Sequence, residues 1–262
     1  MSAQSMSDIA PDTLTDDELL GAALAAARAD PTDQSEGRWS LVRALHRRAD
    51  RRIFVRVASW CSSPDVVERA LGADVLAQLG TGSEAGVRLF ALESAPILCV
   101  LLRDAEERVI MSALYALGHL DAGDPIDIVS LSTHPSADIR HAVAYALGGR
   151  ADVLSMHALI TLSSDNEEDV RDWATFALGS LCDVDTKEIR ETLMARLSDE
   201  NAEVRGEALV GLAMRADRRV APYLIAALKS GDTHYLVLEA AEELLTACPD
   251  ETELQEIFAA RR

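Results

Sequence analysis

The sequence DIRHAVAYALG at residues 138–148 decides the fold, because it returns along the chain at nearly constant spacing. Residues 169–179 read DVRDWATFALG and residues 203–213 read EVRGEALVGLA. Looser copies lie at 66–80, 108–118 and 237–245. The leucine that the copies share recurs after 38, 30, 31, 34 and 33 residues, at Leu79, Leu117, Leu147, Leu178, Leu212 and Leu245. A period of this length is typical of a repeated pair of helices.

Within each copy, the apolar residues follow the period of an α-helix. With the Val or Ile after the acidic residue as position zero, positions zero, four, seven and eight share an arc of roughly 120°. Apolar or small residues occupy these positions, so we expect the arc to be buried, with Leu147, Leu178 and Leu212 almost inaccessible. The small residues at positions four and seven allow neighbouring helices to approach closely. Four copies have a glycine after the leucine, which predicts a left-handed helix stop at Gly80, Gly118, Gly148 and Gly179.

The repeating unit is a pair of helices joined by an acidic turn. Each copy described above is the second helix of its pair (the B helix), and it follows a shorter apolar helix (the A helix). This unit resembles the HEAT repeat, most closely the short HEAT repeats named after phycobilisome lyases, from about residue 50 to 248. The resemblance implies an all-α fold, a right-handed α-solenoid of about five to six HEAT-like helix pairs with N- and C-terminal helical caps.

The chain is predicted to have three parts: a disordered N-terminus (1–11), an N-terminal helical cap (12–62), and a HEAT-like repeat array with an acidic C-terminal cap (63–262). Thr15 and Glu18 have the spacing of a capping box, which predicts a helix that starts there and ends near residue 30. Further helices are predicted at about 36–49 and 50–62. No stretch shows sustained strand alternation, so no sheet is expected.

An acidic residue stands six positions before an arginine in two successive turns, in the pairs Asp165/Arg171 and Asp199/Arg205. This spacing allows the pair either to bridge its own turn or to reach the neighbouring repeat. In HEAT-like families such pairs form a ladder, and the resemblance implies one here. Two positions depart from the pattern: His134 replaces the acidic residue before Arg140, and Ile110 replaces the arginine after Asp104.

Composition and charge exclude several classes of protein. The chain is 48% hydrophobic but only 4% aromatic, and its 25 Lys and Arg oppose 44 Asp and Glu, giving a net charge of −19. Such a surface repels duplex DNA, so no duplex DNA partner is expected. The N-terminus has no secretory signal pattern and the longest apolar run, 95–102, is too short to cross a bilayer. We therefore expect a cytoplasmic, bacterial protein without membrane contact, whose four cysteines are free thiols.

No catalytic or metal-ligating pattern is found in the sequence. The six histidines form no HxH motif and no i, i+4 pair with an intervening Glu, and no cysteine lies at ligand spacing from them. No GxSxG motif occurs either. The sequence therefore predicts neither an enzyme nor a bound cofactor or metal.

The first candidate site is a strip on the B helices. Aromatic residues recur at position six, which lies about 120° or more outside the predicted core arc. With the neighbouring positions two and three, they form a mixed aromatic and acidic strip of Met111, Tyr115, His141, Tyr145, Asp172, Trp173 and Phe176. In the HEAT resemblance, B helices line the concave face. The strip is either a partner-binding surface or ordinary packing between neighbouring B helices.

The second candidate site is a basic island at residues 38–56, which carries a charge of +6 within an acidic chain. Its candidate binding residues are Arg43, Arg47, Arg48, Arg51 and Arg52. The island either binds phosphate or an acidic partner, or pairs with the acidic helix at 12–18 and offsets its neighbours.

Taken together, the sequence favours a non-catalytic scaffold or adaptor that binds a protein through the concave strip. A surface of −19 charge favours a basic partner, for instance the basic nucleic-acid site of a toxin covered by an immunity or antitoxin-like protein. The alternative is a chromophore or small-ligand handling enzyme of the phycobilisome-lyase type, which needs an open apolar cleft. A HEAT-repeat DNA glycosylase would need Lys and Arg where Tyr, Phe and Asp stand. The sequence predicts no partner identity and no oligomeric state.

Overall fold

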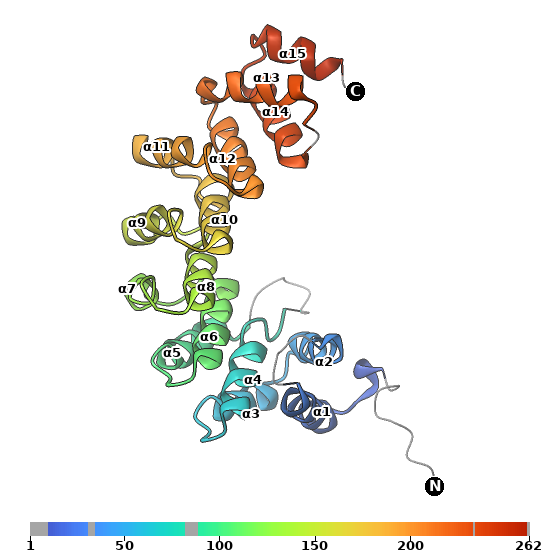
Figure 1. The fold of residues 1–262 in the computed structure, drawn as a ribbon. Coiled ribbons are helices and arrows are strands. Elements are labelled where there is room, and N and C mark those ends of the chain that lie inside the picture. Colours follow the sequence, from blue (N-terminus) through green and yellow to red (C-terminus); the bar gives the residue numbers. More distant parts are fainter. Residues whose placement is uncertain (1–9, 31–34, 82–88, 233, 261–262) are drawn as a thin grey trace. The chain divides into compact units, whose positions relative to one another are not determined.

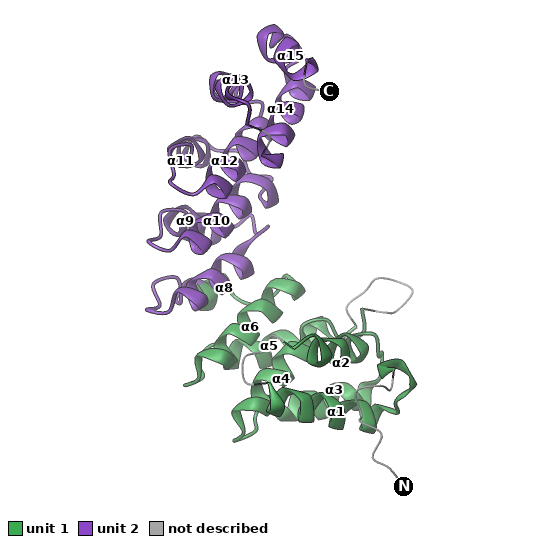
Figure 2. Cartoon of the chain, turned by 45° about the vertical axis from the view of Figure 1, so that its right-hand side comes forward, with its two compact units in different colours: residues 1–128 green, residues 129–262 purple. Residues whose placement is uncertain are grey.

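The computed structural model describes residues 10–30, 35–81, 89–232 and 234–260, and the regular elements in these ranges are all helical (Figure 1). The predicted all-α solenoid of helix pairs is confirmed. The chain forms two compact units, residues 1–128 (unit 1) and residues 129–262 (unit 2), coloured separately in Figure 2. Within the described ranges, no helix is long and apolar enough to span a membrane. The predicted disorder of residues 1–11 falls mainly on residues 1–9, outside the described residues.

Unit 1 is built from helices. Its elements are η2 (Pro11–Thr13), α1 (Asp16–Ala29), α2 (Glu36–His46), α3 (Arg51–Trp60), α4 (Val66–Leu76), α5 (Ala91–Leu101), α6 (Glu107–Leu120) and α7 (Pro125–Val129), which crosses the boundary between the units. Helix α3 packs on α4 as α5 packs on α6. The capping box at the start of α1 is confirmed, because Glu18 accepts a hydrogen bond from the Thr15 backbone N–H at 2.9 Å and the Thr15 hydroxyl accepts one from the Glu18 N–H at 3.4 Å.

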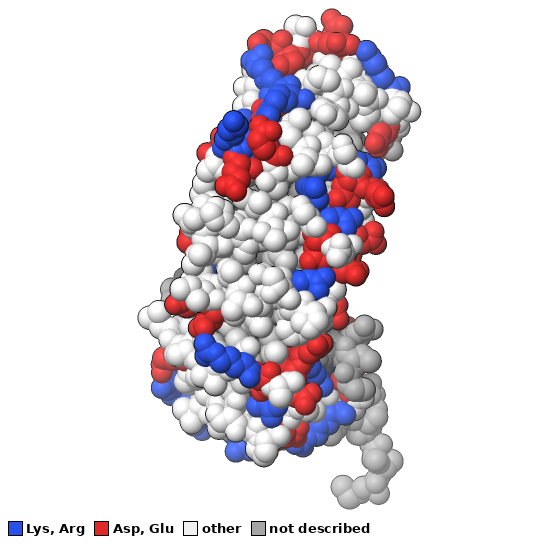
Figure 3. Space-filling model, turned by 60° about the vertical axis from the view of Figure 1, so that its left-hand side comes forward, with Lys and Arg blue, Asp and Glu red and all other residues white. Residues whose placement is uncertain are grey.

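Unit 2 contains successive pairs of A and B helices. Its elements are α8 (Ala137–Leu147), α9 (Val153–Leu162), α10 (Glu168–Phe176), η3 (Ala177–Leu181), α11 (Lys187–Arg196), α12 (Ala202–Met214), η4 (Arg218–Val220), α13 (Ala221–Ser230), α14 (Tyr235–Ala247) and α15 (Thr252–Ala259). The B helices α8, α10, α12 and α14 pack against one another in that order, and the A helices α9 and α11 lie along one side of them (Figure 1). Helix α9 has no Asp, Glu, Lys or Arg, and Figure 3, in which its side comes forward, shows a broad area without charged side chains.

The core follows the repeat register that the sequence predicts. Leu147, Leu178 and Leu212 are each 0% exposed, and the residues at position zero of the same B helices are equally buried (Ile139, Val170 and Val204). This confirms the predicted arc of the B helix. Leucine side chains at the same place in successive repeats therefore form a continuous core within unit 2.

The predicted glycine helix stops are only partly correct. Gly80 has the expected positive φ of +86°. Helix α6 instead runs past Gly118 to Leu120, and Asp121 takes the left-handed conformation. After α8 the positive φ is found at Gly149 rather than Gly148.

Gly179 serves close packing instead of a helix stop. A Cβ atom added at Gly211 on α12 would collide with the Gly179 backbone, so the two repeats meet backbone to backbone at this point. The expectation that small residues at position seven allow close approach is confirmed here, since Gly211 is that residue of α12. Arg215 on the neighbouring repeat binds the backbone at the same place, because its guanidinium donates to the carbonyl groups of Leu178 at 2.8 Å and Cys182 at 2.6 Å.

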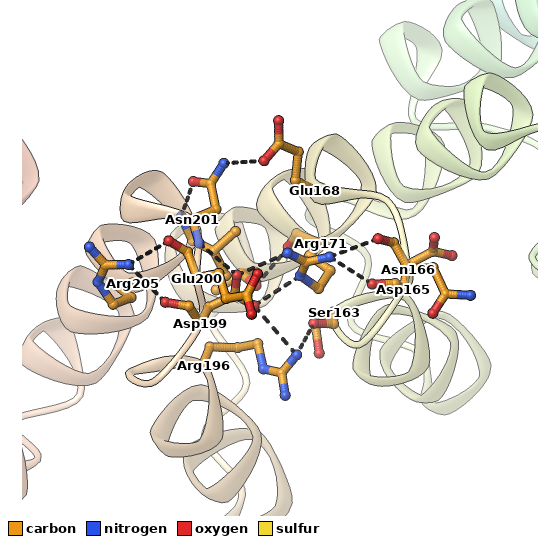
Figure 4. A network of polar contacts seen from close by, with 12 residues as sticks. Ser163, Asp165, Asn166, Glu168, Arg171, Arg196, Asp199, Glu200, Asn201 and Arg205 are labelled. Atoms are coloured by element: carbon orange, nitrogen blue, oxygen red, sulfur yellow. Dashed lines mark hydrogen bonds and ion pairs between the residues drawn. The ribbon is translucent and has the colours of Figure 1, made fainter.

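A ladder of arginine and aspartate side chains runs along the turns of the repeats (Figure 4). Arg171 donates from Nε and Nη2 to the carboxylate of Asp199 in the next repeat, at 2.9 and 3.0 Å. Its third nitrogen, Nη1, donates to the backbone carbonyl of Asp165 in its own turn at 2.9 Å. Arg205 donates in the same way to the carbonyl of Asp199 at 2.7 Å. Each arginine therefore bridges its turn through backbone oxygen and, in the case of Arg171, reaches the neighbouring repeat through a carboxylate.

The same arrangement is repeated at other turns. Arg140 binds the carboxylate of Asp165, with both distances 2.7 Å, and Arg69 in unit 1 binds Asp104 at 2.7 and 3.0 Å. Because a rung joins an arginine to the aspartate of the following repeat, the two departures Ile110 and His134 concern a single rung. His134 keeps the capping role of the missing aspartate, since its Nδ1 accepts a hydrogen bond from the Ser136 N–H at 3.1 Å.

Candidate protein-binding surface on the B helices of unit 2

The face of the B helices opposite the core carries aromatic and acidic side chains. Positions two, three and six and the two residues before position zero project from this side of each helix. We call it the acidic-aromatic face of unit 2, formed by His141 and Tyr145 on α8, Asp172, Trp173 and Phe176 on α10, Glu203 and Glu207 on α12, and Tyr235 and Glu239 on α14. Helix packing brings these residues together, because α10 contacts both α8 and α12, and α12 contacts α14.

Trp173 is the centre of an aromatic cluster. Its ring stacks on Tyr145 with centroids 5.1 Å apart, meets Phe176 edge to face at 5.4 Å, and lies 5.7 Å from the His141 ring. The four side chains are all partly exposed. The rings therefore pack between neighbouring B helices and still present apolar surface to solvent. Burial lowers the pKa of His141 below its ordinary value, so its imidazole is neutral near pH 7.

The other two residues of the predicted strip, Met111 and Tyr115, lie on α6 in unit 1, where both are partly exposed. The acidic-aromatic face lies in unit 2 and does not include them.

Two carboxyl groups on this face have strongly raised pKa values. The pKa of Asp172 rises to about 6, first because of burial and then because of the negative charges of Glu203 and Asp169. The pKa of Glu207 rises to about 7, again because of burial and then because of the charge of Asp172, followed by Glu239 and Glu203. The Oδ1 atom of Asp172 is buried and has no hydrogen-bond partner among the described residues.

The described arginines of unit 2 are paired with other groups. Among the described residues, no Lys or Arg forms an ion pair with Asp172, Glu207 or Glu239. The arginines of α8, α10 and α12 belong to the ladder instead (Arg140, Arg171 and Arg205). Glu203 accepts a hydrogen bond from the Tyr235 hydroxyl at 3.2 Å and lies 3.1 Å from Nε2 of His234. Within the described residues, Asp172, Glu207 and Glu239 therefore place negative charge without a Lys or Arg partner beside apolar rings.

Sequence reasoning identified Asp172 but missed three acidic residues of the face, Glu203, Glu207 and Glu239. The signal was available, because Glu207 occupies the position of Trp173 one repeat later and Glu239 occupies the position of Asp172 two repeats later. Position six holds Val210 on α12, so the aromatic column ends there and does not by itself point to the acidic residues beyond it.

The basic island in unit 1 is largely matched by carboxylates of the same unit. Arg47 binds Asp12 at 2.7 Å and Arg51 binds Glu93 at 2.6 Å, and further ion pairs join Arg43 to Glu36, Arg48 to Asp16, and Arg52 to Asp50 and Asp16. Arg38 is 0% exposed and pairs with Asp74. These contacts correspond to the interpretation of the island as a self-neutralised surface.

An opening of about 850 Å³ lies between α1 and α3 in unit 1. Its lining mixes apolar and charged side chains: Leu20, Leu24, Ile53 and Trp60 with Asp16, Asp17, Arg52 and Arg56. It thus lacks the predominantly apolar walls that a chromophore-handling protein needs. In the described part of the chain, no group of three His, Cys, Asp or Glu side chains is arranged to hold a metal ion. The four cysteines are free, as predicted.

Comparison with known proteins agrees with this architecture. The model of the family described as HEAT repeats matches residues 155–246, so this region is an α-solenoid of HEAT repeats. Protein YibA of Escherichia coli (strain K12) is 30% identical over 238 residues, which cover 88% of this chain and 81% of YibA. The chain belongs to the family of Protein YibA.

Solved structures show the same fold. An X-ray structure of E. coli YibA superposes with a TM-score of 0.67 at 28% identity, covering 95% of this chain and 93% of YibA. An engineered protein gives a TM-score of 0.57 at 17% identity, covering 95% of this chain and 80% of the other. The condensin Cnd3–Cnd2 subcomplex of S. pombe gives 0.58 at 16% identity, covering 90% of this chain and 36% of that chain. The last two likenesses concern the fold alone.

Proposed function

We propose that the protein is a non-catalytic scaffold that binds a basic protein through the acidic-aromatic face of unit 2. The observation that carries this proposal is the absence of a cation partner for Asp172, Glu207 and Glu239 among the described residues, next to the partly exposed rings of the Trp173 cluster. Asp172 and Glu207 are partly buried, and such carboxylates are costly when unpaired, so a partner that supplies cations removes this cost.

The charge of the whole unit supports the same partner. Residues 129–262 hold 13 Lys and Arg against 24 Asp and Glu, a net charge of −11. A surface of this sign increases the encounter rate with a basic protein, and aromatic side chains in a partly buried cluster supply the apolar contacts on which affinity depends. One concrete version is an immunity or antitoxin-like protein that covers the basic nucleic-acid site of a toxin.

Quantitative affinity purification tests the proposal. Wild-type protein is compared with the double variant Asp172→Lys/Glu207→Lys and with a matched control, Glu188→Lys/Glu256→Lys, which makes the same charge change on the A helix α11 and on α15. Circular dichroism checks that all three proteins fold. Proteins retained by wild type and by the control, but lost from the face variant, are expected to have basic isoelectric points and to bind again after purification. Equal retention by all three proteins, or an acidic set of lost proteins, would overturn the proposal.

A further inference from the structure

The repeat register places Asp172 and Glu207 opposite each other across the α10–α12 interface. Trp173, at position three of α10, contacts the residues at positions two and six of α8, which are His141 and Tyr145. Glu207 is the position-three residue of α12, and Asp172 and Phe176 are the position-two and position-six residues of α10. Helix α12 packs on α10 and α10 packs on α8, so the shared register places Glu207 on the side of α12 that is next to Asp172 and Phe176. The charge of Asp172 acts on Glu207, as this placement requires.

This arrangement is two facing carboxylates beside an aromatic ring. The buried Oδ1 of Asp172 lacks a hydrogen-bond donor among the described residues, and the side chain of Glu207 has neither a hydrogen bond nor an ion pair with them. The described residues offer no third ligand for a metal ion here. An organic cation with several N–H donors suits two carboxylates that come from different helices better than a metal does.

We propose that Asp172, Glu207 and Phe176 form a seat for an arginine side chain of the partner, an inference that rests on the function proposed above. A guanidinium group has five N–H donors in a planar fork, so it bonds carboxylates on two sides while its flat face lies against an aromatic ring. A lysine ammonium is a single point charge and reaches both carboxylates less well. The arginine seat thus gives the face a preference for arginine over lysine, beyond its general attraction for positive charge.

Binding to the seat is linked to protons. The charged groups that act on its two carboxylates are Asp169 from α10, Glu203 from α12 and Glu239 from α14, and the Tyr235 hydroxyl and the His234 imidazole contact Glu203. A bound guanidinium favours the ionised form of Asp172 and Glu207, so their protons are released on binding. The affinity for an arginine ligand is therefore expected to increase as the pH rises from about 5.5 to 7.5, the interval in which the free carboxyl groups ionise.

The test uses the full chain and fluorescently labelled peptides of four Arg-Gly, Lys-Gly or citrulline-Gly units, with binding followed by fluorescence anisotropy. Wild type is expected to bind the Arg peptide at least about 5-fold more tightly than the Lys peptide, and not to bind the citrulline peptide measurably. Asp172→Asn and Glu207→Gln are each expected to weaken Arg-peptide binding by about 10-fold and to reduce its pH dependence. The matched control Glu188→Gln is expected to retain both.

Equal affinity for the Arg and Lys peptides, or Arg-peptide binding that both Asp172→Asn and Glu207→Gln leave unchanged, would overturn the arginine seat, as would absence of Arg-peptide binding to wild type. These outcomes are separable from failure of the proposed function. If the purification experiment still shows basic proteins lost from the face variant, the scaffold function stands and only the seat is wrong.

Discussion

Replacing Glu207 by Gln is predicted to stabilise the free protein at alkaline pH. The folded protein holds the pKa of this carboxyl at about 7, against an ordinary 4.5, because of burial and the nearby charge of Asp172. A folded-state pKa above the unfolded value means that the folded protein binds the proton more tightly than the unfolded chain. Above both values the ionised carboxylate therefore destabilises the fold, and below about 4.5 this effect disappears.

The size of the effect follows from the shift. At 1.36 kcal/mol per pH unit, a fully shielded carboxyl with this shift would destabilise the fold by about 3 kcal/mol. Glu207 is partly exposed, so solvent screening reduces the expected value to about 1 kcal/mol. Glu207→Gln is therefore expected to be about 1 kcal/mol more stable than wild type at pH 8 and little different at pH 5.

Urea unfolding followed by circular dichroism at pH 5 and pH 8 measures this difference. Glu188→Gln, an exposed carboxyl on α11, is the matched control and is expected to change stability by less than about 0.5 kcal/mol at either pH. A Gln variant that is less stable than wild type at pH 8 would show that the Glu207 carboxylate is stabilised in the folded protein. The assignment of an uncompensated charge to the face would then be refuted.

Three further predictions concern the core, the aromatic cluster and association with the partner. Leu178→Ala is expected to cost about 2 to 5 kcal/mol in the free energy of unfolding, because a fully buried side chain leaves a cavity, and a loss below 1 kcal/mol would contradict the repeat register. The double variant Tyr145→Ala/Phe176→Ala is expected to keep the melting temperature within a few degrees and to weaken partner binding by about 1 to 4 kcal/mol, whereas global unfolding would identify the rings as core. The association rate with a basic partner, measured by stopped flow, is expected to fall markedly between about 0.02 and 0.5 M salt, while the dissociation rate changes less. Asp172→Asn is expected to lower the association rate at low salt. An association rate that does not change with salt would argue for an apolar ligand instead.

The all-α repeat fold and much of its core could be predicted from the sequence alone. Periodic apolar residues fix which side of each B helix is buried, so Leu147, Leu178 and Leu212 could be identified without coordinates. The capping box of Thr15 and Glu18 could also be predicted, because both partners lie within one helical turn. Features of this kind depend on residues that are close along the chain.

Contacts between repeats were decided only by the tertiary structure. The six-residue spacing of Asp165 and Arg171 did not reveal that the carboxylate of Asp165 belongs to Arg140 of the preceding repeat, because the rung depends on how adjacent helix pairs stack. In the same way, the helix stop at Gly179 was wrong because close packing against Gly211 of the next repeat outweighs the local preference of glycine. At the end of α8 the helix does stop before Gly148, but the positive φ lies one residue later, at Gly149.

The candidate sites, too, were predicted from local sequence only in part. The helical periodicity of the B helices could place Asp172 and Trp173 outside the core. Only helix packing brings Glu207 of the next repeat close to Asp172. The basic island had a strong local charge in the sequence, and its compensation came from acidic residues distant along the chain, such as Asp74 and Glu93. Net charge is a property of composition and can be read from the sequence. The pairing of charges depends on distances in three dimensions, so it is known only from the fold.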